Sequence, residues 1–146
     1  MRILLSAMLL GVFVTAQAGG KVSVYKTPTC GCCQKWVAHL EENGFEVSTH
    51  DMADLRSIKL MAGVQPQYAS CHTAIIDGYV VEGHVPASDI KRLLTERPNI
   101  VGISVPGMPI GSPGMEHGDN RENFTVITLE KDGTEKVFSL HGPAHD

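Results

Sequence analysis

Three of the four cysteines lie within four residues, at Cys30, Cys32 and Cys33. A strand-like apolar run precedes them and a helix-like run follows, so we expect these thiols at a helix N-terminus. Unpaired N–H groups and the positive end of the helix dipole stabilise a thiolate there, which lowers the expected thiol pKa values. Thiolates are redox nucleophiles and ligands of soft metals. We therefore expect the chemistry of this chain at the cysteine cluster.

The Cys30/Cys33 pair alone is a CxxC motif, which is typical of thioredoxin-like redox proteins when it follows a first strand and opens a first helix. Cys32 departs from that pattern. A third thiol can divert the intermediate disulfide of a redox enzyme, whereas a metal site gains a ligand from it. A disulfide between Cys32 and Cys33 would be strained, because adjacent residues rarely meet disulfide geometry. The cluster is thus predicted to be reactive or metal-binding rather than a structural cross-link.

Cys71, the fourth cysteine, lies just before a predicted strand, where a thioredoxin-like fold places the loop that faces its CxxC motif. We therefore expect Cys71 to meet the other three thiols. His72 follows it, either as a ligand, as a group that contacts a ligand, or as a solvated loop histidine. An all-thiolate set suits copper(I), zinc or iron–sulfur. Structural zinc usually takes two spaced ligand pairs, so adjacent thiolates favour a site that bridges several copper(I) ions.

A glycine- and proline-rich segment and the residues just after it carry Met108, Met115 and His117. Thioethers and imidazoles also accept copper, but packing of the loop onto the domain is the alternative we favour for the methionines. His141 and His145 are a weaker metal signal, better interpreted as a disordered tail. The remaining histidines are interpreted as surface or packing residues, at His39, His50 and His84.

Apolar periodicity predicts the order βαβαββα, an α/β arrangement around a mixed sheet. The predicted strands cover residues 21–26, 45–51, 73–77 and 79–81. The predicted helices end near residues 44, 63 and 98, and they begin near Cys33, Asp54 and Pro86. A long loop over 99–123 is followed by a second hairpin over 124–129 and 137–140. We therefore predict a thioredoxin-like domain with a C-terminal loop, rich in glycine, proline and methionine, and a β-hairpin.

The N-terminal segment 1–18 has the pattern of a secretory signal peptide, with Arg2, an apolar run and a small-x-small site at Ala16-Gln17-Ala18. The apolar run is about a dozen residues, short of the roughly 20 that span a bilayer as a helix. We expect export, cleavage after Ala18, no stable membrane anchor and one mature domain over 19–146.

The mature chain loses only Arg2 from its charged residues, which leaves eleven Lys and Arg against sixteen Asp and Glu and a formal charge of −5. No basic cluster is present, which argues against a nucleic-acid partner. Phosphate-binding glycine loops, a Ser/His/Asp triad and paired catalytic carboxylates are not evident in the sequence.

Three motifs resemble one family: TPTCGCC at 27–33, SCHTAIIDGYVVEGHVP at 70–86 and PGMPIGSPGME at 106–116. The chain resembles the CopG-type copper-resistance proteins, exported bacterial proteins long known as a domain of unknown function. The resemblance implies a thioredoxin-like fold and a periplasmic location. It also implies copper bound by the residues that match Cys30, Cys32, Cys33 and Cys71, as a multinuclear copper(I) cluster. A redox role in converting copper between oxidation states is a further implication of the resemblance.

Three functions stay open at this point. The favoured one is a periplasmic copper-binding protein of copper resistance, whose partners are copper ions and other periplasmic copper-handling proteins. In this hypothesis four thiolates hold copper(I), assisted by His72, Met108, Met115 or His117. The second is a thiol-disulfide or copper oxidoreductase that uses the Cys30/Cys33 pair. The third is a structural zinc domain.

Overall fold

The computed structural model describes residues 20–145, within which one seven-stranded mixed sheet runs in the order β2-β1-β3-β4-β5-β6-β7. The strands are β1 (Lys21–Lys26), β2 (Glu46–Asp51), β3 (Thr73–Ile76), β4 (Tyr79–Glu82), β5 (Gly102–Ser104), β6 (Phe124–Leu129) and β7 (Val137–His141). The helices are α1 (Gly31–Glu42), α2 (Arg56–Met61), a short 3-10 turn η1 (Pro66–Tyr68) and α3 (Ala87–Glu96). The predicted signal peptide lies outside the described residues. None of the helices within residues 20–145 has the length and apolar character needed to cross a membrane.

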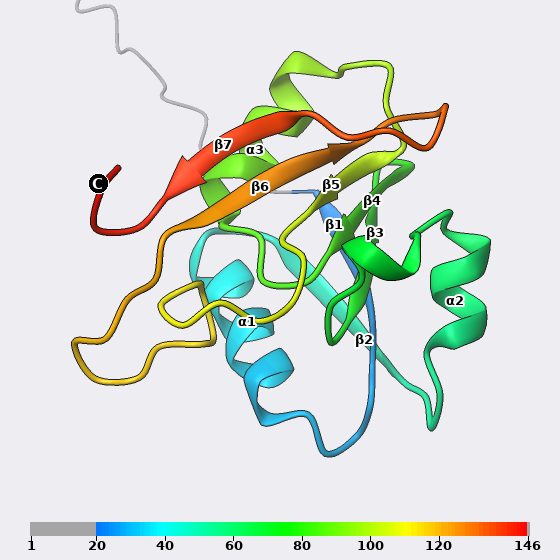
Figure 1. The fold of residues 1–146 in the computed structure, drawn as a ribbon. Helices are drawn as coiled ribbons and strands as arrows, with labels where there is room; N and C mark the ends of the chain where they lie inside the picture. Colours follow the sequence, from blue (N-terminus) through cyan, green and yellow to red (C-terminus); the bar gives the residue numbers. More distant parts are fainter. Residues whose placement is uncertain (1–19, 146) are drawn as a thin grey trace, which may run out of the picture.

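The sheet is mixed, as predicted. β1 pairs in parallel with β2 and antiparallel with β3, which forms a hairpin with β4. The two faces carry separate apolar clusters, because alternate strand residues point to opposite sides. The larger cluster packs between the sheet and the helices α1 and α3 (Figure 1), with Val24, Trp36, Leu40, Ala74, Val81 and Ile90 among its members. A smaller cluster around Val64 and Val80 covers the opposite face, near α2 and η1.

Helix α1 forms as its periodicity predicts, with a buried face of Cys33, Trp36 and Leu40. It ends at Glu42 with Asn43 as the C-cap, and Gly44 follows with φ +89°, a left-handed conformation that glycine adopts without strain. The Trp36 indole N–H donates to the Val85 carbonyl over 2.8 Å. This bond fixes the rotation of α1 on the sheet, and with it the direction of the cysteines in its first turn.

The prediction of an uninterrupted loop over 99–123 is wrong, because β5 lies within it, between β4 and β6. Three residues are too few to reveal alternation in the sequence, and the glycine that opens the strand is unfavourable for strand formation on its own. The neighbouring strand explains the glycine instead, since a Cβ on Gly102 would lie 1.9 Å from the Val80 carbonyl oxygen. Glycine at this position therefore allows β5 to come close enough to β4 to pair with it.

The interpretation of the C-terminal histidines as a disordered tail is also wrong for His141. That residue closes β7 opposite Phe124, and the two rings stack with centroids 5.1 Å apart. His141 Nε2 lies 2.7 Å from Asp89 Oδ2 on α3. The hairpin β6–β7 thus continues the main sheet and is tied to α3.

A Gly102→Ala substitution should destabilise the protein by about 2 kcal/mol, since the added methyl forces β5 away from β4. Gly31→Ala is the matched control, because a Cβ there meets nothing within 4 Å. Urea unfolding of the oxidised protein measures both. A Gly102→Ala variant as stable as the wild type would contradict the close approach.

Candidate metal centre

The N-terminus of α1 presents three cysteines. Cys30 is the N-cap residue, and its Sγ accepts a hydrogen bond from the Cys33 N–H over 3.3 Å. Cys30 and Cys33 form a disulfide, with Cα atoms 5.3 Å apart. Cys32 stays a free thiol, half-buried, with its Sγ 3.5 Å from that of Cys30. The CxxC pair and the additional cysteine therefore occupy one helical turn in different redox states.

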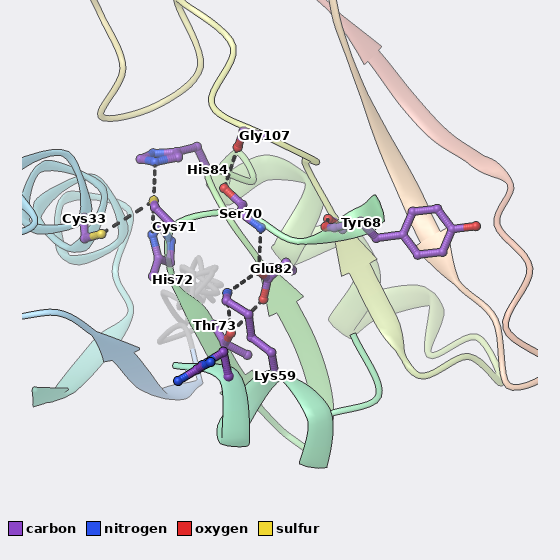
Figure 2. Close-up of polar contacts among 12 residues, drawn as sticks. Cys33, Lys59, Tyr68, Ser70, Cys71, His72, Thr73, Glu82, His84 and Gly107 are labelled. Atoms are coloured by element: carbon purple, nitrogen blue, oxygen red, sulfur yellow. Dashed lines mark hydrogen bonds and ion pairs between the residues drawn. The ribbon is translucent and has the colours of Figure 1, made fainter. Parts of the chain in front are cut away.

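Cys71 meets this turn from the segment that leads into β3, as the sequence predicts. Its Sγ lies 3.5 Å from Cys33 Sγ, and Figure 2 shows the contact bridging α1 and the β3 segment. The sulfur atoms of all four cysteines lie within 4.8 Å of one another. Two stretches of chain, whose residues Cys33 and Cys71 are 38 positions apart, thus bring four sulfurs to one point.

Two buried histidines extend the sulfur cluster. Cys71 Sγ lies 3.2 Å from His72 Nδ1 and 2.9 Å from His84 Nε2. His84 Nδ1 lies 2.8 Å from the Pro113 carbonyl, which can only accept, so Nδ1 carries the proton. A neutral His84 consequently turns its Nε2 lone pair toward Cys71. These three residues form a second group of close ligand atoms, with one sulfur and two imidazoles.

Burial keeps both imidazoles neutral. It lowers the pKa of His72 well below its ordinary value, and the proximity of His84 and of the Lys59 ammonium acts in the same direction. It also lowers the pKa of His84, against the opposing effect of its bond to Pro113. His72 packs on Trp36 with ring centroids 4.4 Å apart, and its buried Nε2 has no hydrogen-bond partner in the described part of the chain. Neutral imidazoles with a free nitrogen are the protonation state that binds metals.

The interpretation of His84 as a surface or packing residue missed its place beside Cys71. The signal was present in the predicted hairpin. A two-residue turn at Asp77-Gly78 pairs Thr73 with Glu82, as observed, and two steps further along the same ladder it sets Cys71 opposite His84. Extending the predicted register beyond the strand ends would have found the residue.

Cys71 differs from a helix-terminal thiol. Burial, followed by the neighbouring Cys32, raises the pKa of Cys71 to about 12. The lowered pKa expected for thiols at the α1 terminus does not extend to this cysteine, because burial and the neighbouring Cys32 disfavour its thiolate. Metal binding at Cys71 has to displace a firmly held proton.

The glycine- and proline-rich segment lies against the cluster. Gly114 adopts φ +86°, and a Cβ there would meet the Cys32 carbonyl oxygen at 2.7 Å and the Trp36 nitrogen at 2.9 Å. Met115 follows it and is half-buried, whereas Met108 is 52% exposed. His117 is exposed and belongs to neither group of close ligand atoms. The loop therefore brings its backbone to the site at Gly114, with Met115 next in the chain.

Comparison with known proteins places these features in a family. The family described as "Protein of unknown function, DUF411" matches residues 68–115, the stretch that holds Cys71 and both histidines. Two solved structures of copper resistance protein CopG, form 1 and form 2, are each 46% identical with a TM-score of 0.81. They cover 86% and 85% of this chain, respectively, and 99% of their own. The chain belongs to the CopG family of copper resistance proteins. No curated protein sequence matched it.

The CopG relationship spans both halves of the cysteine cluster. The family model matches only residues 68–115, which follow the CxCC turn. The alignment with the CopG structure covers 85% of the chain, so it extends well beyond that segment. The named relatives are copper resistance proteins, and the convergent thiols are a donor set that copper accepts.

Alkylation of Cys71 should depend steeply on pH. In an oxidised Cys32→Ser variant Cys71 is the one free thiol, and its burial persists. Its reaction rate with iodoacetamide should rise about tenfold per pH unit between pH 7 and 10, since only the thiolate reacts and its fraction grows tenfold per unit below the pKa. Labelling is measured by mass spectrometry. A Cys32→Ser/Cys71→Ser variant gives the background, and a rate that levels off below pH 9 would contradict the buried environment.

Proposed function

We propose that this protein binds copper(I) in copper resistance, with Cys30, Cys32, Cys33 and Cys71 as its main ligands. The observation that carries the proposal is the convergence of four sulfurs within 4.8 Å from two separate segments. Soft thiolates select copper(I) over the hard divalent cations. The Cys30–Cys33 disulfide must first be reduced, which takes two electrons and two protons and yields two more thiols.

The proposed site holds several copper(I) ions. Cys32 and Cys33 are adjacent, which suits them poorly to one tetrahedral centre and well to bridging neighbouring ions. His72 supports this extension, because its buried Nε2 has no hydrogen-bond partner among residues 20–145. His84 presents a second imidazole to Cys71 from the segment that follows β4. Copper is the cargo in this proposal, and the thiolates and imidazoles provide room for more than one ion.

Assisting ligands come from the loop. We assign this role to Met115 first, because Gly114 before it contacts the α1 turn. Met108 follows Gly107, whose N–H donates to the Ala69 carbonyl over 3.1 Å near the Cys71 segment. His117 is a candidate for receiving or releasing copper at the surface, since it is exposed. These three would move copper between the buried thiolates and other periplasmic copper-handling proteins.

The setting we propose is a thioredoxin-like domain exported to the periplasm. The strand order β2-β1-β3-β4 with an antiparallel β3, and a CxxC pair that opens α1 directly after β1, support that fold. The signal-peptide pattern over 1–18 supports export of a mature domain over 19–146.

A second candidate function is supported by the disulfide itself. Cys30 and Cys33 are joined, and Cys71 lies 3.5 Å from Cys33 Sγ. An oxidoreductase would cycle this pair between dithiol and disulfide, passing two electrons to a substrate disulfide or, one at a time, to two copper(II) ions. Cys32 has no place in that cycle, whereas the copper-binding function requires it.

The reduced protein should retain more than one copper(I) per chain, under anaerobic competition with a colorimetric copper(I) chelator. Cys32→Ser should weaken copper retention by at least about tenfold. Losing a residue that only hydrogen-bonds to a metal ligand already lowers metal affinity roughly 10–100-fold, and Cys32 is proposed as a ligand itself. The oxidised protein is the matched control, since its disulfide withdraws two sulfurs and should lower retention similarly.

Copper(I) retention that is the same in Cys32→Ser as in the wild type would contradict the four-thiolate site. Turnover of disulfides or copper(II) that survives Cys32→Ser but stops in Cys33→Ser would establish the oxidoreductase instead. Retention of zinc alone, without redox activity, would leave a structural zinc domain.

A further inference from the structure

A buried carboxylate lies behind Cys71 and takes no part in the site described above. Glu82 ends β4 and is fully buried. It points to the sheet face opposite α1, toward Lys59 of α2 (Figure 2). A charged group in this position has to be accounted for, since burying a carboxylate is costly unless it is paired and hydrogen-bonded.

Glu82 holds both sides of the Cys71-His72 pair. Its Oε1 accepts from the backbone N–H of Ser70 over 2.7 Å, and its Oε2 accepts from the Thr73 hydroxyl over 2.7 Å. These donors are the residues immediately before Cys71 and immediately after His72. One carboxylate therefore clamps the two ends of the dipeptide that supplies a sulfur and an imidazole to the site (Figure 2).

Lys59 completes the clamp. Its Nζ donates to Glu82 Oε1 over 2.5 Å and to Thr73 Oγ1 over 3.1 Å. Burial raises the pKa of Glu82, while Lys59 and the hydrogen bonds from Ser70 and Thr73 act to lower it. The ammonium thus supports the charged form, in which both carboxylate oxygens can accept.

The same contacts also reach the glycine- and proline-rich segment that carries Met108. The Ser70 hydroxyl donates to the Gly107 carbonyl, next to Met108. Gly83 makes room for Ser70, because a Cβ on Gly83 would lie 2.5 Å from Ser70 Cβ. Ser70 is held through its N–H by Glu82 and holds the loop through its hydroxyl, so one residue links the buried ion pair to the loop.

Stability alone does not explain the pair. Replacing a buried ion pair with apolar residues of similar volume is often neutral or stabilising, because desolvation offsets the attraction between the charges. The hydrogen bonds to Ser70 and Thr73, in contrast, have no apolar substitute. The geometry of those two donors depends on the carboxylate.

We propose that Glu82, with Lys59 as its counter-ion, is a positioning residue for the copper site: it fixes the backbone around Cys71 so that this sulfur meets Cys33. The proposal rests on the copper-binding function only for its consequence in copper affinity. Its geometric content is independent of copper, since it concerns the approach of two sulfurs that are 3.5 Å apart.

The decisive variant is Lys59→Met/Glu82→Met, which removes the clamp while keeping an apolar volume. In a Cys30→Ser/Cys32→Ser background only Cys33 and Cys71 remain, and their disulfide can be equilibrated with glutathione. The effective concentration of one thiol for the other should fall at least about tenfold in the variant, because small displacements of reacting atoms cost that much or more. A structural role without positioning would leave this value unchanged while thermal unfolding changed.

Copper provides the second measurement. In the chain with all four cysteines, Lys59→Met/Glu82→Met should lower copper(I) affinity about 10–100-fold and alter the thiolate-to-copper absorption bands. Glu82→Gln should give a smaller loss, since its amide keeps one acceptor oxygen. Asp89→Asn is the matched control: Asp89 is also a buried carboxylate, with its Oδ2 2.7 Å from His141 Nε2, and its replacement should leave both readouts within about twofold, since changes away from a network add independently.

The outcomes separate the two proposals. A folded Lys59→Met/Glu82→Met variant with wild-type effective concentration and copper affinity would overturn the positioning role. Should that variant fail to fold, Glu82→Gln decides in its place, and wild-type values for both readouts would overturn the role. If the wild type retained no copper but the effective concentration still fell, the copper function would fail and the positioning of Cys71 would stand.

Discussion

The register of the β3–β4 hairpin is the constraint on which the site depends. Asp77 and Gly78 both have positive φ, at 48° and 82°, as a two-residue turn with the twist of its strands requires. That turn pairs Thr73 with Glu82 and brings Cys71 and His84 together beyond the last pair. A slip of one residue in this register would move one strand's side chains to the other face of the sheet and set Cys71 opposite a different residue. A local choice of turn residues therefore determines which groups face the cysteines of α1.

The second half of the site depends on how α1 is held. Its first turn carries Cys32 and Cys33, and the Trp36 bond to Val85 sets the rotation of the helix. Gly114 contacts the same turn, so the loop, the helix and the hairpin meet at one place. The sulfurs of Cys30 and Cys33 have two exclusive uses there, as a disulfide or as ligands. The proposed function thus links copper binding to the redox state of one pair of cysteines.

Much of the frame could be predicted from local patterns. Strands β1 to β4 and helices α1 and α3 lie within a few residues of their predicted positions, because alternation and helical periodicity are local properties. The meeting of Cys71 with the α1 cysteines also followed, since the position of a CxxC turn relative to the strands implies a facing loop. These predictions needed only sequence spacing and a small set of topologies.

What could not be predicted depends on contacts between distant segments. β5 is too short to show a pattern, and its place is decided by the approach of Gly102 to Val80. Glu82 and Asp89 are carboxylates whose burial is made tolerable by partners on other elements, Lys59 and His141. Propensity carries no information about such partners. His84 was recoverable, but only by extending the hairpin register beyond the strands.

X-ray absorption on anaerobically reduced, copper-loaded protein tests the central claim most directly, because it reports both ligand type and contacts between copper ions. The account predicts more than one copper(I) per chain, a coordination shell dominated by sulfur and a resolved copper–copper contribution. A single copper ion with nitrogen and oxygen ligands, and no neighbouring copper, would contradict it.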